Sequence, residues 1–189
     1  MRQLKPAVML FITFTILTGI IYPAVITGLA QLIFPHQANG SLIIRDGQII
    51  GSELIGQQFN DLKYFWGRPS ATIDAPYDAS HSGGSNLSAV NPELEKRVQT
   101  RIQTLRDADP ENIQLIPVDL VTSSASGLDP NISVASAEYQ AARVARARDL
   151  PIAQMDALIK QYTHNRILGI FGERTINVLE INLALDELQ

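Results

Sequence analysis

Near its start the chain carries a long stretch without formal charge, and this stretch limits the kinds of fold that the chain can adopt. Apart from His36, no side chain between Pro6 and Ile44 is charged near neutral pH. The apolar run 7–33 is about 27 residues long, so as a helix it would extend about 40 Å, more than the roughly 30 Å of a hydrocarbon core. The sequence therefore predicts one transmembrane helix.

The rest of the chain is polar enough to form a water-soluble domain. We expect residues 1–6 to be a cytoplasmic N-terminus, 34–41 a linker and 42–189 the soluble domain, whose roughly 150 residues are enough to bury a core. Helix-like and strand-like patterns follow one another without a regular βαβ rhythm. This favours a single transmembrane helix followed by one α+β domain.

The charges that flank the run predict its orientation. Arg2 and Lys5 precede it without an acid, whereas the first basic residue after it is Arg45, beside Asp46. Because Lys and Arg close to a span favour the cytoplasmic side, we expect a cytoplasmic N-terminus and an extracytoplasmic domain. A cleaved secretory signal is the alternative, since 28–30 (Gly-Leu-Ala) offers small residues, but signal peptides usually have apolar regions of only about 7–15 residues.

Small residues inside the run predict contact with another helix. Thr15 and Gly19, and likewise Ala24 and Gly28, are four positions apart, a spacing that lets two helices approach closely. Pro23 removes one backbone donor and predicts a distortion at that point. The alternative is that such residues are simply common in single spans. Because the run holds no Asp, Glu, Lys or Arg, we do not expect it to conduct ions itself.

Several segments of the soluble part have clear local signals. Asp46-Gly47 predicts the turn of a hairpin over 42–50. Asn91 before Pro92 predicts a capped helix that runs to about Asp107. The other expected elements are a strand-like piece at 53–55, an extended apolar segment at 113–121, a helix that begins at Ser133 or Ser136, a helix that begins at Pro151, a strand at 176–181 and a short final helix. Near the end of the helix that begins at Ser133 or Ser136 we expect the basic residues Arg143, Arg146 and Arg148.

No motif for catalysis or metal binding is present. The sequence lacks GxSxG, HExxH, GxGxxG and the P-loop pattern, and it has no cysteine. Its three histidines, His36, His81 and His164, have no second ligand at metal spacing. We expect no catalytic residue and no metal, although a Ser-His-Asp hydrolase remains an alternative because a triad needs only proximity in space. The net charge of −4 argues against nucleic acid.

Two loops rich in glycine and serine are candidate nucleotide sites. Their backbone amides are suited to phosphate, as in anion-binding nests and at helix N-termini. The alternatives are a flexible connection for the first loop and a capped turn for the second. The candidate residues are Ser82, Gly83, Gly84, Ser85 and Asn86 in the first loop, and Ser123, Ser124, Ser126 and Gly127 in the second.

The densest aromatic cluster of the chain lies in the segment YFWGRPSA. We expect Tyr64, Phe65 and Trp66 to fill the core of the domain, with Arg68 stacked on them or paired nearby. A docking surface is the alternative.

In order and spacing these motifs resemble the KdpC family, the C subunits of bacterial Kdp potassium-transporting ATPases, over essentially the full length. The resemblance includes the N-terminal span and four motifs. These motifs are YFWGRPSA at 64–71, SGGSNL at 82–87, DLVTSSASGLDPNIS at 119–133 and ARVARARDLP at 142–151.

The resemblance implies a non-catalytic, single-pass subunit of a complex in the bacterial inner membrane. It implies three partners: a potassium-translocating A subunit, an ATP-hydrolysing P-type B subunit and a small F subunit. It also implies a role in assembly and as a catalytic chaperone that raises the ATP affinity of the B subunit, with ATP bound mainly by that partner.

Two positions depart from the family pattern. Asn131 stands where members commonly have His, and Ala125 where they often have Gly. The implied role also conflicts with the expected orientation, because a chaperone in contact with ATP belongs in the cytoplasm. If the domain is outside, an effect on nucleotide affinity must pass through the membrane helices, or direct ATP contact does not occur.

Overall fold

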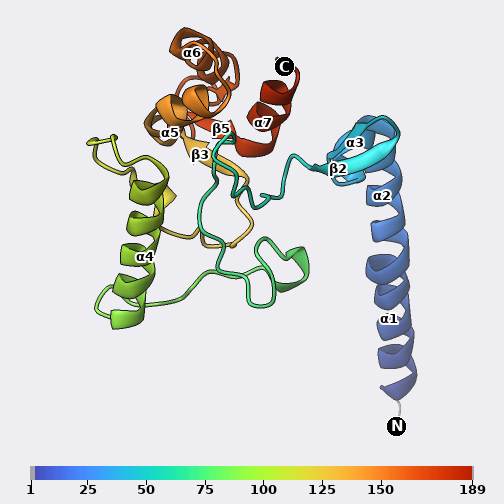
Figure 1. Ribbon diagram of the computed structural model, residues 1–189. Helices are drawn as coiled ribbons and strands as arrows, with labels where there is room; N and C mark the ends of the chain where they lie inside the picture. The colour runs from blue at the N-terminus through green and yellow to red at the C-terminus, as the bar shows by residue number, and fades with distance from the viewer. Residues whose placement is uncertain (1–2, 189) are drawn as a thin grey trace. The chain divides into compact units, whose positions relative to one another are not determined.

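The computed structural model describes residues 3–188, and its residues form two compact units, one up to Ile50 and one from Gly51 onward (Figure 1). Arg2, one of the two basic residues behind the expected orientation, lies outside the described residues.

The first unit is dominated by one continuous helix over Leu4–Ile33, shown in blue in Figure 1. It consists of α1 (Leu4–Ile16), a π-helical turn η1 (Leu17–Ile21) and α2 (Tyr22–Ile33). The π turn directly precedes Pro23, whose missing N–H prevents the regular hydrogen-bond pattern there. With a mean hydropathy of 2.1 and no buried residue in its most apolar window, the helix is long and apolar enough to cross a membrane.

A short helix and a hairpin follow. Helix α3 (Pro35–Ala38) lies in the expected linker. The side-chain amides of Gln31, before this helix, and Asn39, after it, bond each other at 3.2 and 3.3 Å. Strands β1 (Leu42–Arg45) and β2 (Gln48–Ser52) then pair. Asp46 and Gly47 have φ angles of +52° and +75°, the left-handed conformation that two-residue hairpin turns require. The predicted hairpin is confirmed.

The second unit is built on a three-stranded antiparallel sheet in the order β3-β5-β4. Ile132 lies opposite Ile176 at its centre. Helices α5, α6 and α7 gather around this sheet, and a longer helix, α4, lies on another side of the unit (Figure 1). The elements are η2 (Ala79–His81), α4 (Pro92–Ala108), η3 (Val118–Leu120), β3 (Asn131–Ser133), α5 (Val134–Ala147), α6 (Ile152–Gln161), β4 (Thr163–His164), β5 (Thr175–Asn177) and α7 (Val178–Asp186).

The predicted α+β class is confirmed, and so are two helix starts. The Asn91 side chain accepts a hydrogen bond from the Glu93 N–H at the start of α4, and the Ser133 hydroxyl does the same for the Ser136 N–H at the start of α5. The hydrophobic core joins helices, sheet and a loop. Its largest fully buried apolar side chains are Phe65, Leu120, Ile132, Met155, Ile176, Ile181, Leu185 and Val144.

Two expectations for strands were wrong, and a segment expected to be extended becomes helical near its end. The strand expected at 176–181 ends at Asn177, whose side chain accepts from two N–H groups of the following helix and so begins α7. Residues 53–55 form a turn closed by a bridge between Ser52 and Ile55. The apolar segment 113–121 contains no strand and ends in η3.

Candidate functional site

Two buried side-chain amides hold the aromatic segment in place. Asn182 of α7 accepts from the Phe65 N–H at 2.9 Å and donates to the Phe65 carbonyl at 2.9 Å. Gln140 of α5 accepts from the Trp66 N–H at 2.8 Å and donates to the Trp66 carbonyl at 3.1 Å. Each amide therefore satisfies a donor and an acceptor of the loop as a neighbouring strand would. Phe65 and Trp66 lie in the core, with 0% and 5% of their surface exposed.

Arginine side chains cover the aromatic rings. The Arg143 guanidinium lies 4.5 Å from the Trp66 ring centroid, and that of Arg101 lies 5.5 Å from it. Arg148 lies 4.9 Å from the Tyr64 ring and pairs with Asp186 at 2.7 Å. Burial lowers the pKa of Arg143 to about 10.

The three basic residues lie near the end of α5, as expected. Arg143 and Arg148 are buried against the aromatic segment. Arg146, by contrast, is exposed and pairs with Asp109.

Arg68 connects the aromatic segment to the second candidate loop. Its Nη1 pairs with Asp129 Oδ2 at 3.0 Å, its Nη2 donates to the Ser123 carbonyl at 3.3 Å, and its Nε donates to the Thr122 carbonyl at 3.4 Å. These bonds fix both ends of the loop to one guanidinium.

The fold brings the two candidate loops together. The Ser126 carbonyl accepts from the Gly83 N–H at 2.8 Å and from the Ser82 hydroxyl at 3.1 Å. Gly127 has a φ of +69°, and a Cβ there would lie 2.7 Å from the Gly83 carbonyl oxygen. A Cβ on Gly84 would similarly lie 3.0 Å from the Ala125 carbonyl oxygen. Both glycines are therefore explained by close contact between backbones.

Hydroxyls of the second loop bond its own backbone. Ser124 accepts from the Gly127 N–H at 3.0 Å, and Ser126 accepts from the Leu128 N–H at 3.2 Å. Ser85 and Ser123 line a small cavity of about 60 Å³, and Asn86 is held at a φ of +52°. Contact of these residues with a nucleotide stays a prediction.

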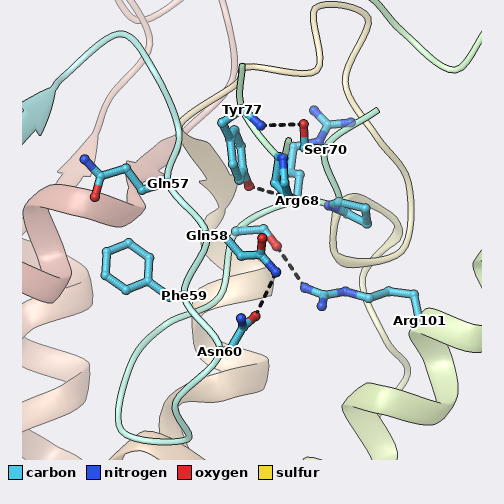
Figure 2. Close-up of a pocket in the computed structure, with 11 residues that line it drawn as sticks. Gln57, Gln58, Phe59, Asn60, Arg68, Ser70, Tyr77 and Arg101 are labelled. Atoms are coloured by element: carbon cyan, nitrogen blue, oxygen red, sulfur yellow. Dashed lines mark hydrogen bonds between the residues drawn. The ribbon is translucent and has the colours of Figure 1, made fainter. Parts of the chain in front are cut away.

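A second cavity, of about 200 Å³, opens beside the aromatic segment (Figure 2). Tyr77 lies in its wall, donating its hydroxyl to the Arg68 carbonyl at 2.6 Å while its N–H bonds the Ser70 hydroxyl at 2.9 Å. Burial raises the pKa of Tyr77 to about 12. The residues that line the cavity are Gln57, Gln58, Phe59, Asn60, Gly67, Arg68, Pro69, Ser70, Pro76, Tyr77 and Arg101.

Sequence reasoning missed this cavity. Of its residues, only Arg68 was given a role, and the lining residues outside the YFWGRPSA motif belong to no local pattern. Tyr77 and Arg101 reach the cavity from a loop and from α4, and only the fold brings them together.

The structure also groups His81 with two carboxylates, which sequence spacing did not indicate. His81 Nδ1 lies 2.7 Å from Asp78 and 3.6 Å from Asp74. Hydrogen bonds from Ser80 and His81 lower the pKa of Asp78 to about 2. These groups lie on the surface and already bond one another, so they carry no argument for a metal.

Among residues 3–188 the structure thus combines one helix long enough to cross a membrane with one α+β domain whose motif residues are held in mutual contacts. This is the organisation of a protein with a single membrane anchor. The family model described as "KdpC: K+-transporting ATPase, c chain" matches residues 4–187, and the chain belongs to this family.

Curated relatives are similar in sequence to this chain over nearly its whole length. A protein from Polaromonas naphthalenivorans is 58% identical over 186 residues, which cover 98% of this chain and 95% of the relative. One from Methylococcus capsulatus is 54% identical, covering 100% of this chain and 99% of the relative. One from Variovorax paradoxus is 56% identical, covering 97% and 95%. Each is named a potassium-transporting ATPase KdpC subunit.

Replacing Asn182 by leucine, whose side chain has the same number and branching of heavy atoms, is expected to destabilise the domain strongly. The N–H and carbonyl of Phe65 would remain buried without partners, at a cost of about 1–3 kcal/mol each. Urea unfolding of the detergent-solubilised chain, followed by Trp66 fluorescence, measures the change. The matched substitution Asn165→Leu, at an exposed loop position, should change the free energy of unfolding by no more than about 0.5 kcal/mol. Equal effects of the two substitutions would contradict the role given to Asn182.

The raised pKa of Tyr77 predicts a loss of stability at alkaline pH. The unfolded chain ionises this group above pH 10.0, whereas the folded chain keeps it neutral up to about pH 12. Stability that is present below pH 10 is therefore lost between about pH 10 and 12, by about 2–3 kcal/mol. Tyr77→Phe should remove this part of the decline in urea titrations, and Tyr162→Phe should leave it in place. An unchanged decline in Tyr77→Phe would overturn the assignment.

Proposed function

We propose that the chain is a non-catalytic accessory subunit of an ATP-driven potassium uptake complex in the bacterial inner membrane. Membership in the KdpC family over residues 4–187 is the observation that carries this proposal. The proposed partners are a potassium-translocating A subunit, an ATP-hydrolysing P-type B subunit and a small F subunit. The relatives' names support the first step, since each is called a subunit of a potassium-transporting ATPase.

The N-terminal helix would hold the subunit in the complex. Apart from the adjacent backbone of the helix itself, no atom lies within 4 Å of a Cβ built on Gly19 or Gly28, so both positions leave room for a neighbouring helix. Thr15 and Ala24 complete the two small-residue pairs. Because the helix carries no ionisable group between Lys5 and His36 apart from Tyr22, its role is packing rather than ion conduction.

The domain would lie outside the cytoplasm, as the basic residues before the helix favour. A chaperone effect on the ATP affinity of the B subunit would then act through the packed membrane helices.

Protease treatment of cells with a permeabilised outer envelope tests the orientation of the domain. Digestion of the domain supports a position outside the cytoplasm, and protection until the inner membrane is opened contradicts it.

Direct nucleotide binding by the domain is the second candidate, favoured by the contact between the two glycine- and serine-rich loops. Several of their donors already bond within the chain, among them the N–H groups of Gly83 and Gly127. The cavity of about 60 Å³ that Ser85 and Ser123 line is also smaller than the roughly 300–1,000 Å³ usual for ligand sites. Calorimetry of the purified chain with ATP decides, because absence of heat at millimolar ATP removes this candidate.

Leucine at both Gly19 and Gly28 is expected to weaken assembly, since a larger side chain keeps a neighbouring helix at a distance. Thr13→Leu, in the same helix but outside the two pairs, should have a smaller effect. Co-purification of tagged chain with the A and B subunits from detergent extracts measures both variants. Similar losses would argue against a packed small-residue face, and failure of the unaltered chain to bring down either subunit would overturn the proposed function.

A further inference from the structure

The cavity of Figure 2 contains a cation that has no acidic partner. Arg101 projects from α4 and donates from Nε to the Leu120 carbonyl and from Nη2 to the Gly67 carbonyl, both at 3.0 Å. These bonds use two of the five N–H donors of the guanidinium. Among residues 3–188 no Asp or Glu forms an ion pair with it.

This arrangement differs from that of the other arginines around the aromatic segment. Arg68 pairs with Asp129 and Arg148 with Asp186. Arg143 has no carboxylate partner either, but carbonyl oxygens and Gln140 Oε1 occupy both of its terminal nitrogens. Among these four, Arg101 is the one that leaves a terminal nitrogen, Nη1, without a hydrogen bond to the described residues. Burial lowers its pKa, which reflects the cost of keeping this charge away from water.

The Nη1 nitrogen of Arg101 is not fully buried. No fully buried side-chain nitrogen or oxygen in the described chain lacks a hydrogen-bond partner, so Nη1, which forms no bond, has its N–H groups accessible. Arg101 lines the cavity, and Figure 2 shows it and Gln58 facing the same region. The accessible donors therefore belong to the cavity rather than to the core.

The rest of the cavity wall is polar but carries no negative charge. None of its lining residues is an Asp or Glu. The Tyr77 hydroxyl is donated to the Arg68 carbonyl, and the Ser70 hydroxyl to the Gly127 carbonyl. Arg68 is neutralised by Asp129, so the wall has one net positive charge, on Arg101. A volume of about 200 Å³ admits a group the size of a side chain.

From these contacts we propose that the cavity is a binding site for one carboxylate group, with Arg101 as its charged anchor. The planar guanidinium matches the two oxygens of a carboxylate, and the single net positive charge of the wall balances one carboxylate but not a phosphate dianion. The carboxylate comes from an Asp or Glu side chain of a partner subunit or from a small free acid. The first source rests on the proposed function, and the second does not.

The first experiment uses acetate and the full-length chain in detergent. Thermal unfolding is followed by fluorescence of Trp66, the single tryptophan, in sodium acetate and in sodium chloride of equal ionic strength. A bound carboxylate raises the midpoint because it stabilises only the folded state. Acetate should therefore raise the midpoint above that in chloride, with a response that saturates.

Three variants assign the response to the cavity. Arg101→Lys keeps the charge but loses the planar fork, so acetate binding should weaken about tenfold. Gln58→Glu retains Arg101 and places a carboxylate in the cavity, so it should abolish the acetate response even if the first variant folds poorly. Arg106→Lys, at an exposed position of the same helix, should respond like the unaltered chain.

The second experiment distinguishes the two sources. If a partner side chain occupies the cavity, Arg101→Lys and Gln58→Glu reduce co-purification of A and B subunits, and acetate no longer stabilises this subunit within the complex. If a free acid is the ligand, co-purification is unchanged and the acetate response persists in the complex. The carboxylate site is overturned if acetate acts no differently from chloride and both variants co-purify normally. Failure of the proposed function alone would leave the acetate response of the isolated chain intact.

Discussion

The domain depends on hydrogen bonds between two side-chain amides and the backbone of the aromatic segment, bonds that a neighbouring strand would otherwise supply. The sheet has only three short strands, too few to surround the aromatic residues. Gln140 and Asn182 supply from two helices the hydrogen bonds that the backbone of Phe65 and Trp66 would otherwise find in a sheet. Because buried backbone groups without partners are costly, the two helices and the loop can pack only in this register.

The same loop organises the charges of the domain. Its carbonyl groups accept from Arg101, Arg143 and Arg148, and these guanidinium groups lie against its aromatic rings. A guanidinium over a ring keeps part of its electrostatic stabilisation when water is removed. The loop therefore places cations inside a small domain, and one of them, Arg101, lines the cavity beside it without a carboxylate partner among the described residues.

Local signals were enough for part of the fold. Asp46-Gly47 specified a hairpin, and Asn91 and Ser133 specified helix starts, because each acts within a few residues. The strand expected at 176–181 was wrong. The prediction followed the β-branched, apolar residues of this run, whereas in the structure the side chain of Asn177 caps α7, which begins one residue later.

Contacts between distant residues were not available to such reasoning. Gln140 lies 74 residues from Trp66, and Asn182 lies 117 residues from Phe65. Neither residue type suggests its partner. Phe65 and Trp66 could thus be predicted as core, whereas Tyr64, expected with them, is only partly buried. The amides that hold the segment could not be predicted, nor could Tyr77 and Arg101 of the cavity wall. The two candidate loops were found by composition, whereas their mutual contact required the fold.

That mutual contact changes how genetic data on the loops must be interpreted. Ser82 and Ser126 are 44 residues apart in sequence and share one hydrogen bond, and Gly127 and Gly83 touch through their backbones. Substitutions in the two loops will consequently be non-additive, since either one releases the same contact. A double-mutant cycle across the pair will report their coupling directly, and a lone phenotype at either loop measures the integrity of both.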